Sequence, residues 1–357
     1  MNVTDEEAES RLLREVVPVV VPIIFGIIVT VGLFGNGLVV LVVSCNLQMR
    51  STTNLLIINL AVADLLFIIF CVPFTATDYA MTIWVFGDAW CKIVQYLVFV
   101  TAYASVFTLV LMSMDRFLAV VLPIASMGVR TERNACLAIL CTWSVILVAC
   151  VPIMLSHGEV RHHANSTAVS CMFLDSQLNQ IPDGQGYNYP AFQITFFVTS
   201  YVLPLLVIIA MYLLLLKRLW LGVVPGGHMS AESLRGKRRV TRMVVVVVVI
   251  FAVCWCPIQI ILVVRSLNKY PITEASVLIQ IVAHVQAYMN SCINPILYAF
   301  LSENFRKAFF KVIYCAPRQQ AAAGGRPQRA SEMRPLNDTK TTRSTLVNGN
   351  KESVHIL

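Results

Sequence analysis

The chain has 357 residues, of which 57% are hydrophobic and only 13% are charged. Its mean hydropathy is +0.74, and a typical soluble domain carries about 25% charged residues, so the composition argues against a soluble protein. The net charge is +8. The basic residues gather between apolar segments, which indicates membrane topology and not nucleic-acid binding.

Seven stretches are long and apolar enough to cross a membrane, because about 20 helical residues span ~30 Å of hydrocarbon. They are Val17–Cys45, Asn54–Thr77, Ile93–Met114, Cys136–Leu155, Ala191–Leu216, Met243–Val264 and Ala275–Leu301. Membrane helices tolerate the glycines and prolines in them when neighbouring helices satisfy the freed backbone groups. The expected fold is an all-α membrane protein, a seven-transmembrane helix bundle over residues 17–301.

The amino tail, residues 1–16, is acidic, which is the wrong charge for a cleavable signal peptide. Only six of the 27 lysines and arginines fall on the same side of the membrane as this tail. The positive-inside rule therefore predicts an extracellular amino terminus and a cytoplasmic carboxyl tail. Glycosylation sequons begin at Asn2 and Asn165, both on the expected outer side.

Only two of the eleven cysteines, Cys91 and Cys171, fall in the expected outer segments. Two cysteines alone in an oxidising compartment are expected to form a disulfide, which would hold the loop of residues 156–190 across the mouth of the bundle. Cys315 follows the inner end of the last span, so it is either a palmitoylation site or a free thiol.

Asp64 is the one acid deep within a span. A carboxylate at that depth marks a functional site by default, although a protonated aspartic acid bonded within the bundle is the alternative. Other spans offer oxygen-bearing side chains, and a hard cation such as sodium prefers oxygen ligands. The expected sodium site consists of Asp64, Ser105, Asn290, Ser291 and Asn294.

Two spans carry an internal proline, Pro257 after Cys254-Trp255-Cys256 and Pro295 after Asn294. Proline removes a backbone hydrogen bond and kinks a helix, more often for structural than for functional reasons. Asp115 and Arg116 follow 22 uncharged residues, so they are either the solvated end of a helix or a device at the inner face.

Residues 302–315 are expected to form an interfacial amphipathic helix. Phe305, Phe309 and Phe310 should share one face, and nearby lysines and arginines should meet lipid headgroups. Residues 316–357 are polar and are expected to be a disordered cytoplasmic tail. The tail is either inert or phosphorylated, the candidate sites being Ser331, Thr339, Thr341, Thr342, Ser344 and Thr345.

Together these motifs resemble the rhodopsin-like (class A) G-protein-coupled receptors over residues 17–315. The matching residues are Gly35-Asn36, Leu60-Ala61-Val62-Ala63-Asp64, Cys91 with Cys171, Asp115-Arg116-Phe117, Trp143, Pro204, Cys254-Trp255-Cys256-Pro257 and Asn294-Pro295-Ile296-Leu297-Tyr298. The family usually has tyrosine where this chain has Phe117. That change leaves the Asp115–Arg116 pair intact.

The resemblance implies how such a protein works. Asp115 and Arg116 would form an inactive-state latch, and an outward swing of the sixth span would free Arg116 for a heterotrimeric G protein. It also assigns activation roles to Trp255, Pro257, Asn294, Pro295 and Tyr298. It further implies a multi-pass plasma-membrane location, and arrestin and receptor kinases as partners of a phosphorylated tail.

The ligand pocket lacks the charges of two known receptor groups. Amine receptors of the family place an aspartate where this chain has Val98, and opsins carry a lysine in the stretch corresponding to Val282–Tyr288, which has none. What remains is a polar, mostly neutral mouth that suits a peptide, although such side chains form helix–helix hydrogen bonds just as often. The candidate ligand-binding residues are Gln95, Phe99, Gln259, Arg265, Gln280, His284 and Tyr288.

The resemblance extends most closely to the galanin and insect allatostatin-A receptors, through Ile83–Gly87, Asn290–Tyr298 and Leu301–Arg306. It implies an amidated neuropeptide ligand that ends in aromatic-Gly-Leu-amide, with a galanin-like or other peptide as the alternative. A transporter or channel is disfavoured, because no inverted repeat is evident. No catalytic set of nucleophile, base and orienting group indicates an enzyme, and sodium is the only bound ion or cofactor expected.

Overall fold

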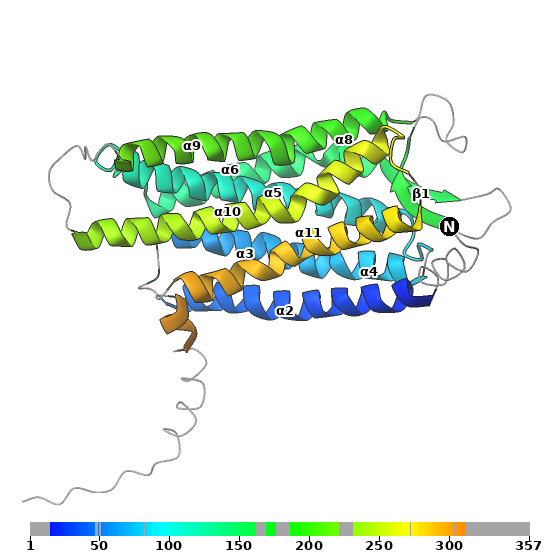
Figure 1. Cartoon of the computed structure of the whole chain (residues 1–357), viewed down its shortest axis with the longest axis horizontal. Helices are drawn as coiled ribbons and strands as arrows, with labels where there is room; N and C mark the ends of the chain where they lie inside the picture. Colours follow the sequence, from blue (N-terminus) through cyan, green and yellow to red (C-terminus); the bar gives the residue numbers. More distant parts are fainter. Residues whose placement is uncertain are drawn as a thin grey trace, which may run out of the picture. The chain divides into compact units, whose positions relative to one another are not determined.

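The computed structural model describes residues 15–46, 49, 51–81, 83–161, 169–175, 186–220, 231–271, 273–302 and 305–310. Long helices run side by side through residues 17–301, as expected, and a short hairpin lies at one end of them (Figure 1). In chain order the elements are α2 (Val17–Cys45), α3 (Thr52–Phe70), α4 (Val72–Met81), α5 (Asp88–Val121), α6 (Glu132–Ala149), α7 (Val151–Leu155), β1 (His157–Arg161), β2 (Val169–Phe173), α8 (Tyr189–Phe197), η3 (Val198–Val202), α9 (Leu203–Trp220), α10 (Ala231–Ser266) and α11 (Glu274–Leu301).

Six helical segments of the described chain are long and apolar enough to cross a membrane. The seventh helix, α11, is 28 residues long and packs against α2, α3 and α10. Its apolar run is interrupted by Gln280, His284, Asn290 and Asn294. Large apolar side chains such as Phe34, Val148, Leu213 and Phe300 are exposed on the bundle's outer surface, where lipid would cover them.

Three of the spans are interrupted near a proline. The break between α3 and α4 falls at Cys71, two residues before Pro73, and the break between α6 and α7 falls at Cys150, two residues before Pro152. A proline has no N–H to donate, and its ring clashes with the carbonyl four residues earlier. The same cause accounts for the wider π-helical turn η3 just before Pro204.

The helix α5 extends further than its apolar run. It spans Asp88–Val121, whereas the sequence predicted Ile93–Met114. Asp115 and Arg116 therefore lie inside a helix, and the interpretation that they are its solvated end is wrong. Their side chains are held by tertiary bonds, which a hydropathy pattern does not reveal.

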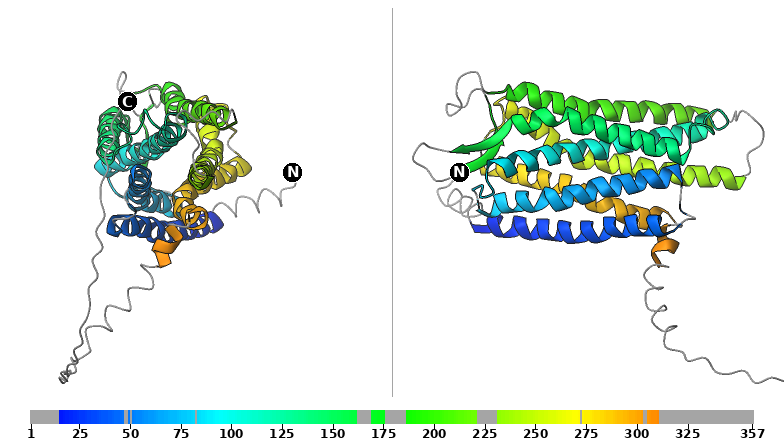
Figure 2. Two further views of the ribbon diagram at one scale, coloured as in Figure 1. Left: turned by 90° about the vertical axis from the view of Figure 1, so that its left-hand side faces the viewer. Right: turned by 180° about the vertical axis from the view of Figure 1, so that it is seen from behind.

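A β-hairpin covers one end of the bundle, where the sequence predicted only a loop. The strands β1 and β2 are antiparallel, with Glu159 opposite Cys171. The predicted disulfide between Cys91 and Cys171 is present and ties β2 to the first turn of α5. The Asp88 carboxylate also accepts a hydrogen bond of 3.0 Å from the Glu159 amide. The hairpin is thus fixed as a lid, at what we call the hairpin end (Figure 2).

The buried side chains form clusters that meet at Trp255. One cluster fills the half of the bundle away from the hairpin, another lies among α2, α4, α10 and α11, and a third surrounds Phe99 on α5. The Trp255 ring packs against all three, and its indole Nε1 has no hydrogen-bond partner among the described residues. Movement at this residue therefore disturbs both halves of the bundle.

A short helical turn over residues 305–310 follows α11. Phe305 and Phe309 pack into the core, but Phe310 is 53% exposed, so the prediction that all three phenylalanines share a face is wrong for Phe310. Phe305, Ala308 and Phe309 share the buried face, and Phe310 points away from it because residues five apart on a helix are separated by about 140°. Residues 1–14, Asn165, Cys315 and the tail of residues 316–357 lie outside the described residues.

Candidate functional site

A cavity of about 430 Å³ lies beneath the hairpin, and we call it the hairpin-end cavity. Its walls come from α4, α5, α8, α10 and α11, and its roof from β1 and β2. The structure brings all seven candidate ligand-binding residues together here: Gln95, Phe99, Gln259, Arg265, Gln280, His284 and Tyr288. These residues are widely separated in sequence, so their convergence depends on the bundle.

Several of these side chains already bond to protein groups. Gln259 is 3% exposed and donates its amide to Ser200 across 3.4 Å. At the rim, Arg265 donates to the Gln280 carbonyl across 3.2 Å. Gln259 therefore makes the helix–helix contact that was the alternative interpretation, while still presenting a surface to the cavity.

Two aromatic residues on α11, Tyr288 and His284, join that helix to α4. The Tyr288 hydroxyl and the Thr75 hydroxyl are 3.1 Å apart, and the Tyr79 hydroxyl lies 2.9 Å from His284 Nδ1. Both bonds join α4 to α11, so this part of the wall is rigid. The Tyr288 ring also meets the Phe67 ring edge-on at 4.8 Å.

Several residues that line the cavity were not predicted from the sequence. Asp78 and Tyr79 lie on α4, which continues to Met81, whereas the predicted span ended at Thr77. His157 comes from the unexpected strand β1, where it packs among the rings of Phe99 and Phe173. Burial lowers the pKa of His157 to about 4, although its bond to the Ile153 carbonyl acts in the opposite direction. The imidazole is therefore neutral at physiological pH.

Deeper in the bundle, Asp64 is fully buried. Its Oδ2 accepts a hydrogen bond of 2.9 Å from the Asn294 amide. The Ser105 and Ser291 hydroxyls lie near the same carboxylate. The structure thus brings Asp64, Ser105, Ser291 and Asn294 together. Asn290 is also buried on α11, one turn before Asn294.

The oxygen atoms at this position fit a small hard cation. Asp64 Oδ1, Asn290 Oδ1 and Asn294 Oδ1 are buried and lack hydrogen-bond partners within the described chain. An unpaired buried oxygen is costly, and a bound cation would satisfy several at once. Carboxylate and amide oxygens are the ligands that hard cations prefer.

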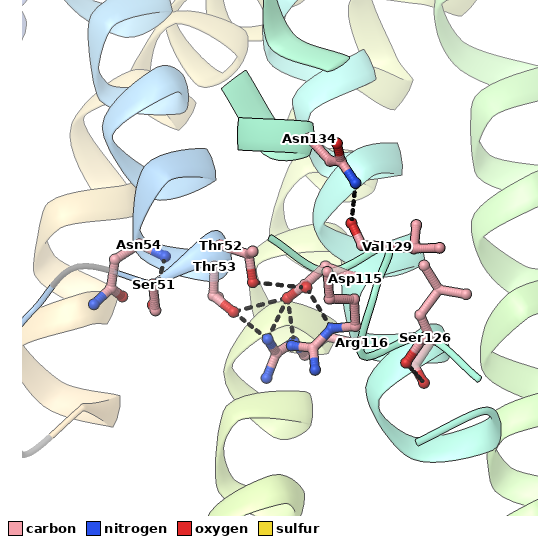
Figure 3. Close-up of polar contacts among 11 residues, drawn as sticks. Ser51, Thr52, Thr53, Asn54, Asp115, Arg116, Ser126, Val129 and Asn134 are labelled. Atoms are coloured by element: carbon pink, nitrogen blue, oxygen red, sulfur yellow. Dashed lines mark hydrogen bonds and ion pairs between the residues drawn. The ribbon is translucent and has the colours of Figure 1, made fainter. Parts of the chain in front are cut away.

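At the opposite end of the bundle, Asp115 is the centre of a polar cluster (Figure 3). Its carboxylate accepts hydrogen bonds from Arg116, from Thr52 at 3.0 Å, from Thr53 at 2.7 Å and from Arg130 Nε at 2.9 Å. The Arg116 guanidinium also donates to the Thr53 hydroxyl. We call these five residues the Asp115 cluster.

The predicted Asp115–Arg116 pair is therefore present, but three of its partners were missed. Arg130 lies between α5 and α6, and the two threonines begin α3. No local sequence signal links these positions to Asp115, because they meet only through folding. Every hydrogen-bond partner of Arg116 within the described residues lies on α3 or α5, and none lies on α10.

A second cavity, of about 450 Å³, opens beside this cluster. Three arginines line it, Arg116, Arg130 and Arg239, together with Met243 from α10 and Phe305 after α11. Tyr298 is fully buried nearby, next to the Phe305 ring. The predicted activation residues thus extend from Trp255 and Pro257 in the middle of the bundle to Asn294, Pro295 and Tyr298 towards this basic cavity.

A lidded cavity at one end, a buried acid in the middle and a basic cavity at the other end define a seven-helix transmembrane receptor. Residues 35–298 match the family model described as 7 transmembrane receptor (rhodopsin family). The chain therefore belongs to the rhodopsin family of seven-transmembrane receptors. It is a multi-pass plasma-membrane protein that signals through heterotrimeric G proteins, and it is not an enzyme.

Curated relatives resemble the chain over most of their length. It is 59% identical to the allatostatin-A receptor of Bombyx mori over 355 residues, which cover 99% of this chain and 92% of that one. It is 42% identical to galanin receptor type 2 of Mus musculus, with 88% and 79% of the two chains covered. The galanin receptor 2a of Danio rerio is 39% identical, with 85% and 80% covered.

Proposed function

We propose that this receptor is activated by an amidated neuropeptide of the allatostatin-A type, bound in the hairpin-end cavity. The observation that carries the proposal is the 59% identity to the Bombyx mori allatostatin-A receptor across 99% of this chain. The convergence of all seven candidate residues on one lidded cavity supports it. A galanin-like ligand is the second candidate, because the Danio rerio galanin receptor 2a and the Mus musculus galanin receptor type 2 are 39% and 42% identical.

The chemistry of the cavity favours a peptide with an amidated carboxyl end. A carboxamide both donates and accepts hydrogen bonds, as the side chains of Gln95, Gln259 and Gln280 do. A free carboxylate needs a cation to offset its loss of water. Arg265 is the cation lining this cavity in the described chain, but it is exposed and already donates to Gln280. Exposed pairing contributes only ~0–1 kcal/mol.

The hairpin end faces the outside of the cell, and the Asp115 cluster faces the cytoplasm. The distribution of lysine and arginine supports this orientation, with the amino tail extracellular. Sodium binds at Asp64, Ser105, Asn290, Ser291 and Asn294, and it stabilises the inactive state because activation disturbs that site. The unpaired oxygens at this position support the ion.

Modifications and further partners act on the outer segments and on the carboxyl tail. Asn2 and Asn165 carry glycans on the outer side. Cys315, five residues after the turn of residues 305–310 in the sequence, is palmitoylated, and that turn rests on lipid headgroups. Receptor kinases phosphorylate serines and threonines of the carboxyl tail, and arrestin binds the product. The matching sequence motifs support these roles.

The deciding experiment measures agonist-dependent nucleotide exchange on a G protein in membranes that contain this chain. A peptide ending in Phe-Gly-Leu-amide should activate exchange, and the same peptide as a free acid should be at least about tenfold weaker. Galanin is the comparison ligand. Preference for galanin would favour the second candidate, whereas equal potency of acid and amide, or loss of acid binding alone in Arg265→Ala, would show a carboxylate pocket.

A further inference from the structure

The hairpin-end cavity contains one acidic side chain, Asp78, and one strongly basic side chain, Arg265, and the two do not pair. Of the described residues that line it, Asp78 is the only carboxylate and Arg265 the only arginine or lysine. Arg265 bonds to Gln280 instead. Asp78 has no hydrogen bond or ion pair to any residue that the structure describes, although its side chain is exposed and lines the cavity.

The position of Asp78 is set by a rigid element. It lies on α4, and its neighbours Thr75 and Tyr79 on that helix are bonded to Tyr288 and His284 of α11. Asp78 is three residues after Thr75, so the two share a side of the helix. The carboxylate is therefore presented from a wall fixed to α11 and not from a loop.

A carboxylate in this position affects which ligand can bind. A ligand that fills the cavity removes water from Asp78, and that loss is unfavourable unless a new partner replaces the water. A neutral ligand leaves the carboxylate without compensation. A ligand with a guanidinium or ammonium group forms a charge-assisted hydrogen bond there, which is stronger than a neutral one.

Arg265 does not supply that partner from within the protein. Both Asp78 and Arg265 lie within electrostatic reach of Tyr79, but no ion pair joins them. The adjoining cavity of about 620 Å³ shares Arg265, Gln280, Phe173 and Tyr189 with this one. That cavity has its own carboxylate, Asp175, so Asp78 is the acid available to the part of a ligand that lies beside α4.

We propose that Asp78 determines specificity by accepting a cationic group of the peptide ligand, in addition to its amidated end. The inference rests on the proposed function, since it assumes that a peptide fills this cavity. The cationic group is a basic side chain or the amino terminus. Either one offers the same chemistry to the carboxylate.

The test uses synthetic heptapeptides that end in Phe-Gly-Leu-amide. One series places a single arginine at each upstream position, a matched series places norleucine there, and a third arm acetylates the amino terminus. Each is assayed for G-protein activation on the wild type, on Asp78→Asn and on Glu159→Gln. Glu159 is an exposed acid of β1 that lines neither cavity, so it controls for a general change in surface charge.

We expect removal of one cationic group to reduce potency on the wild type by about tenfold, equivalent to ~1.4 kcal/mol. Asp78→Asn should abolish that preference and Glu159→Gln should keep it. Sensitivity to acetylation alone would identify the amino terminus as the source, and sensitivity to arginine replacement would identify a side chain. A cation preference that is equal in the wild type and Asp78→Asn, or absent from both, overturns the inference. Failure of every peptide to activate the wild type overturns the proposed function itself.

Discussion

Removing the charge of Asp115 should increase signalling in the absence of ligand. The carboxylate binds two guanidinium groups and two threonine hydroxyls, and its side chain is only 7% exposed. Breaking a buried ion pair by removing one partner costs about 3–5 kcal/mol. In Asp115→Asn the shape is retained, so the change acts through the lost charge.

Only part of that cost alters the balance between inactive and active states. If about one third is specific to the conformation in which the Asp115 cluster is closed, the equilibrium moves by ~1.4 kcal/mol, or about tenfold. Arg130 is 27% exposed, so solvent screens its share. Arg130→Gln should therefore raise basal activity by about fivefold at most, equivalent to ~1 kcal/mol.

The assay is ligand-independent nucleotide exchange on the G protein, normalised to receptor at the cell surface. Arg133→Gln is the matched control, because Arg133 is an exposed arginine close in sequence to Arg130 that takes no part in the cluster. Unchanged basal activity in Asp115→Asn would refute the reasoning. So would an Arg130→Gln effect as large as that of Asp115→Asn.

Three further outcomes are expected. Asp64→Asn should abolish the reduction of agonist affinity by sodium, and a sodium effect of unchanged size would contradict the proposed ion site. Cys91→Ser or Cys171→Ser should greatly weaken peptide binding at matched surface expression, since the hairpin is released; normal affinity would make the bridge dispensable. Because the pKa of His157 is about 4 in the fold and ~6.5 when exposed, lowering the pH from 7 to 5 should favour the open hairpin by up to ~2 kcal/mol. Peptide affinity should fall accordingly in the wild type and much less in His157→Phe.

Sequence alone predicted the parts of the molecule that depend on composition and spacing. Apolar runs indicated seven spans, and the positions of Cys91 and Cys171 indicated the disulfide, because both signals are local or depend on few residues. The missed parts depend on tertiary contacts. Arg130 meets Asp115 through folding alone, and Asp78 was missed because a helix can continue past the end of its apolar run.

The hairpin also depends on tertiary contacts that the sequence does not reveal. The disulfide holds β2 to α5, and the Asp88–Glu159 bond holds β1 to α5. Neither bond indicates from the sequence that these segments form strands. For Gln259 the sequence predicted the inward position but left open whether the side chain contacts a ligand or another helix. The structure shows its bond to Ser200. Side-chain partners across helices require the packed structure.

The bonds at the Asp115 end imply that two separate restraints oppose activation. The Asp115 cluster joins α3, α5 and the segment before α6, but it does not include α10. The helix α10 is held instead by packing and by Arg239, whose Nε donates to the Leu301 carbonyl at the end of α11 across 3.2 Å.

A swing of α10 about Pro257 therefore need not break the Asp115–Arg116 pair first. The hydrogen bonds of Asp115 and the bond from Arg239 to Leu301 have no residue in common. Arg116, Arg130 and Arg239 nevertheless line one cavity, so the double variant tests whether the free energies of the two restraints add. If they add, the fold increase in basal activity of the double variant Asp115→Asn/Arg239→Gln should equal the product of the fold increases of the two single variants. The measurement is nucleotide exchange below saturation. An increase no larger than that of Asp115→Asn alone would mean that both bonds belong to one switch, and that α10 cannot move until Arg116 is released.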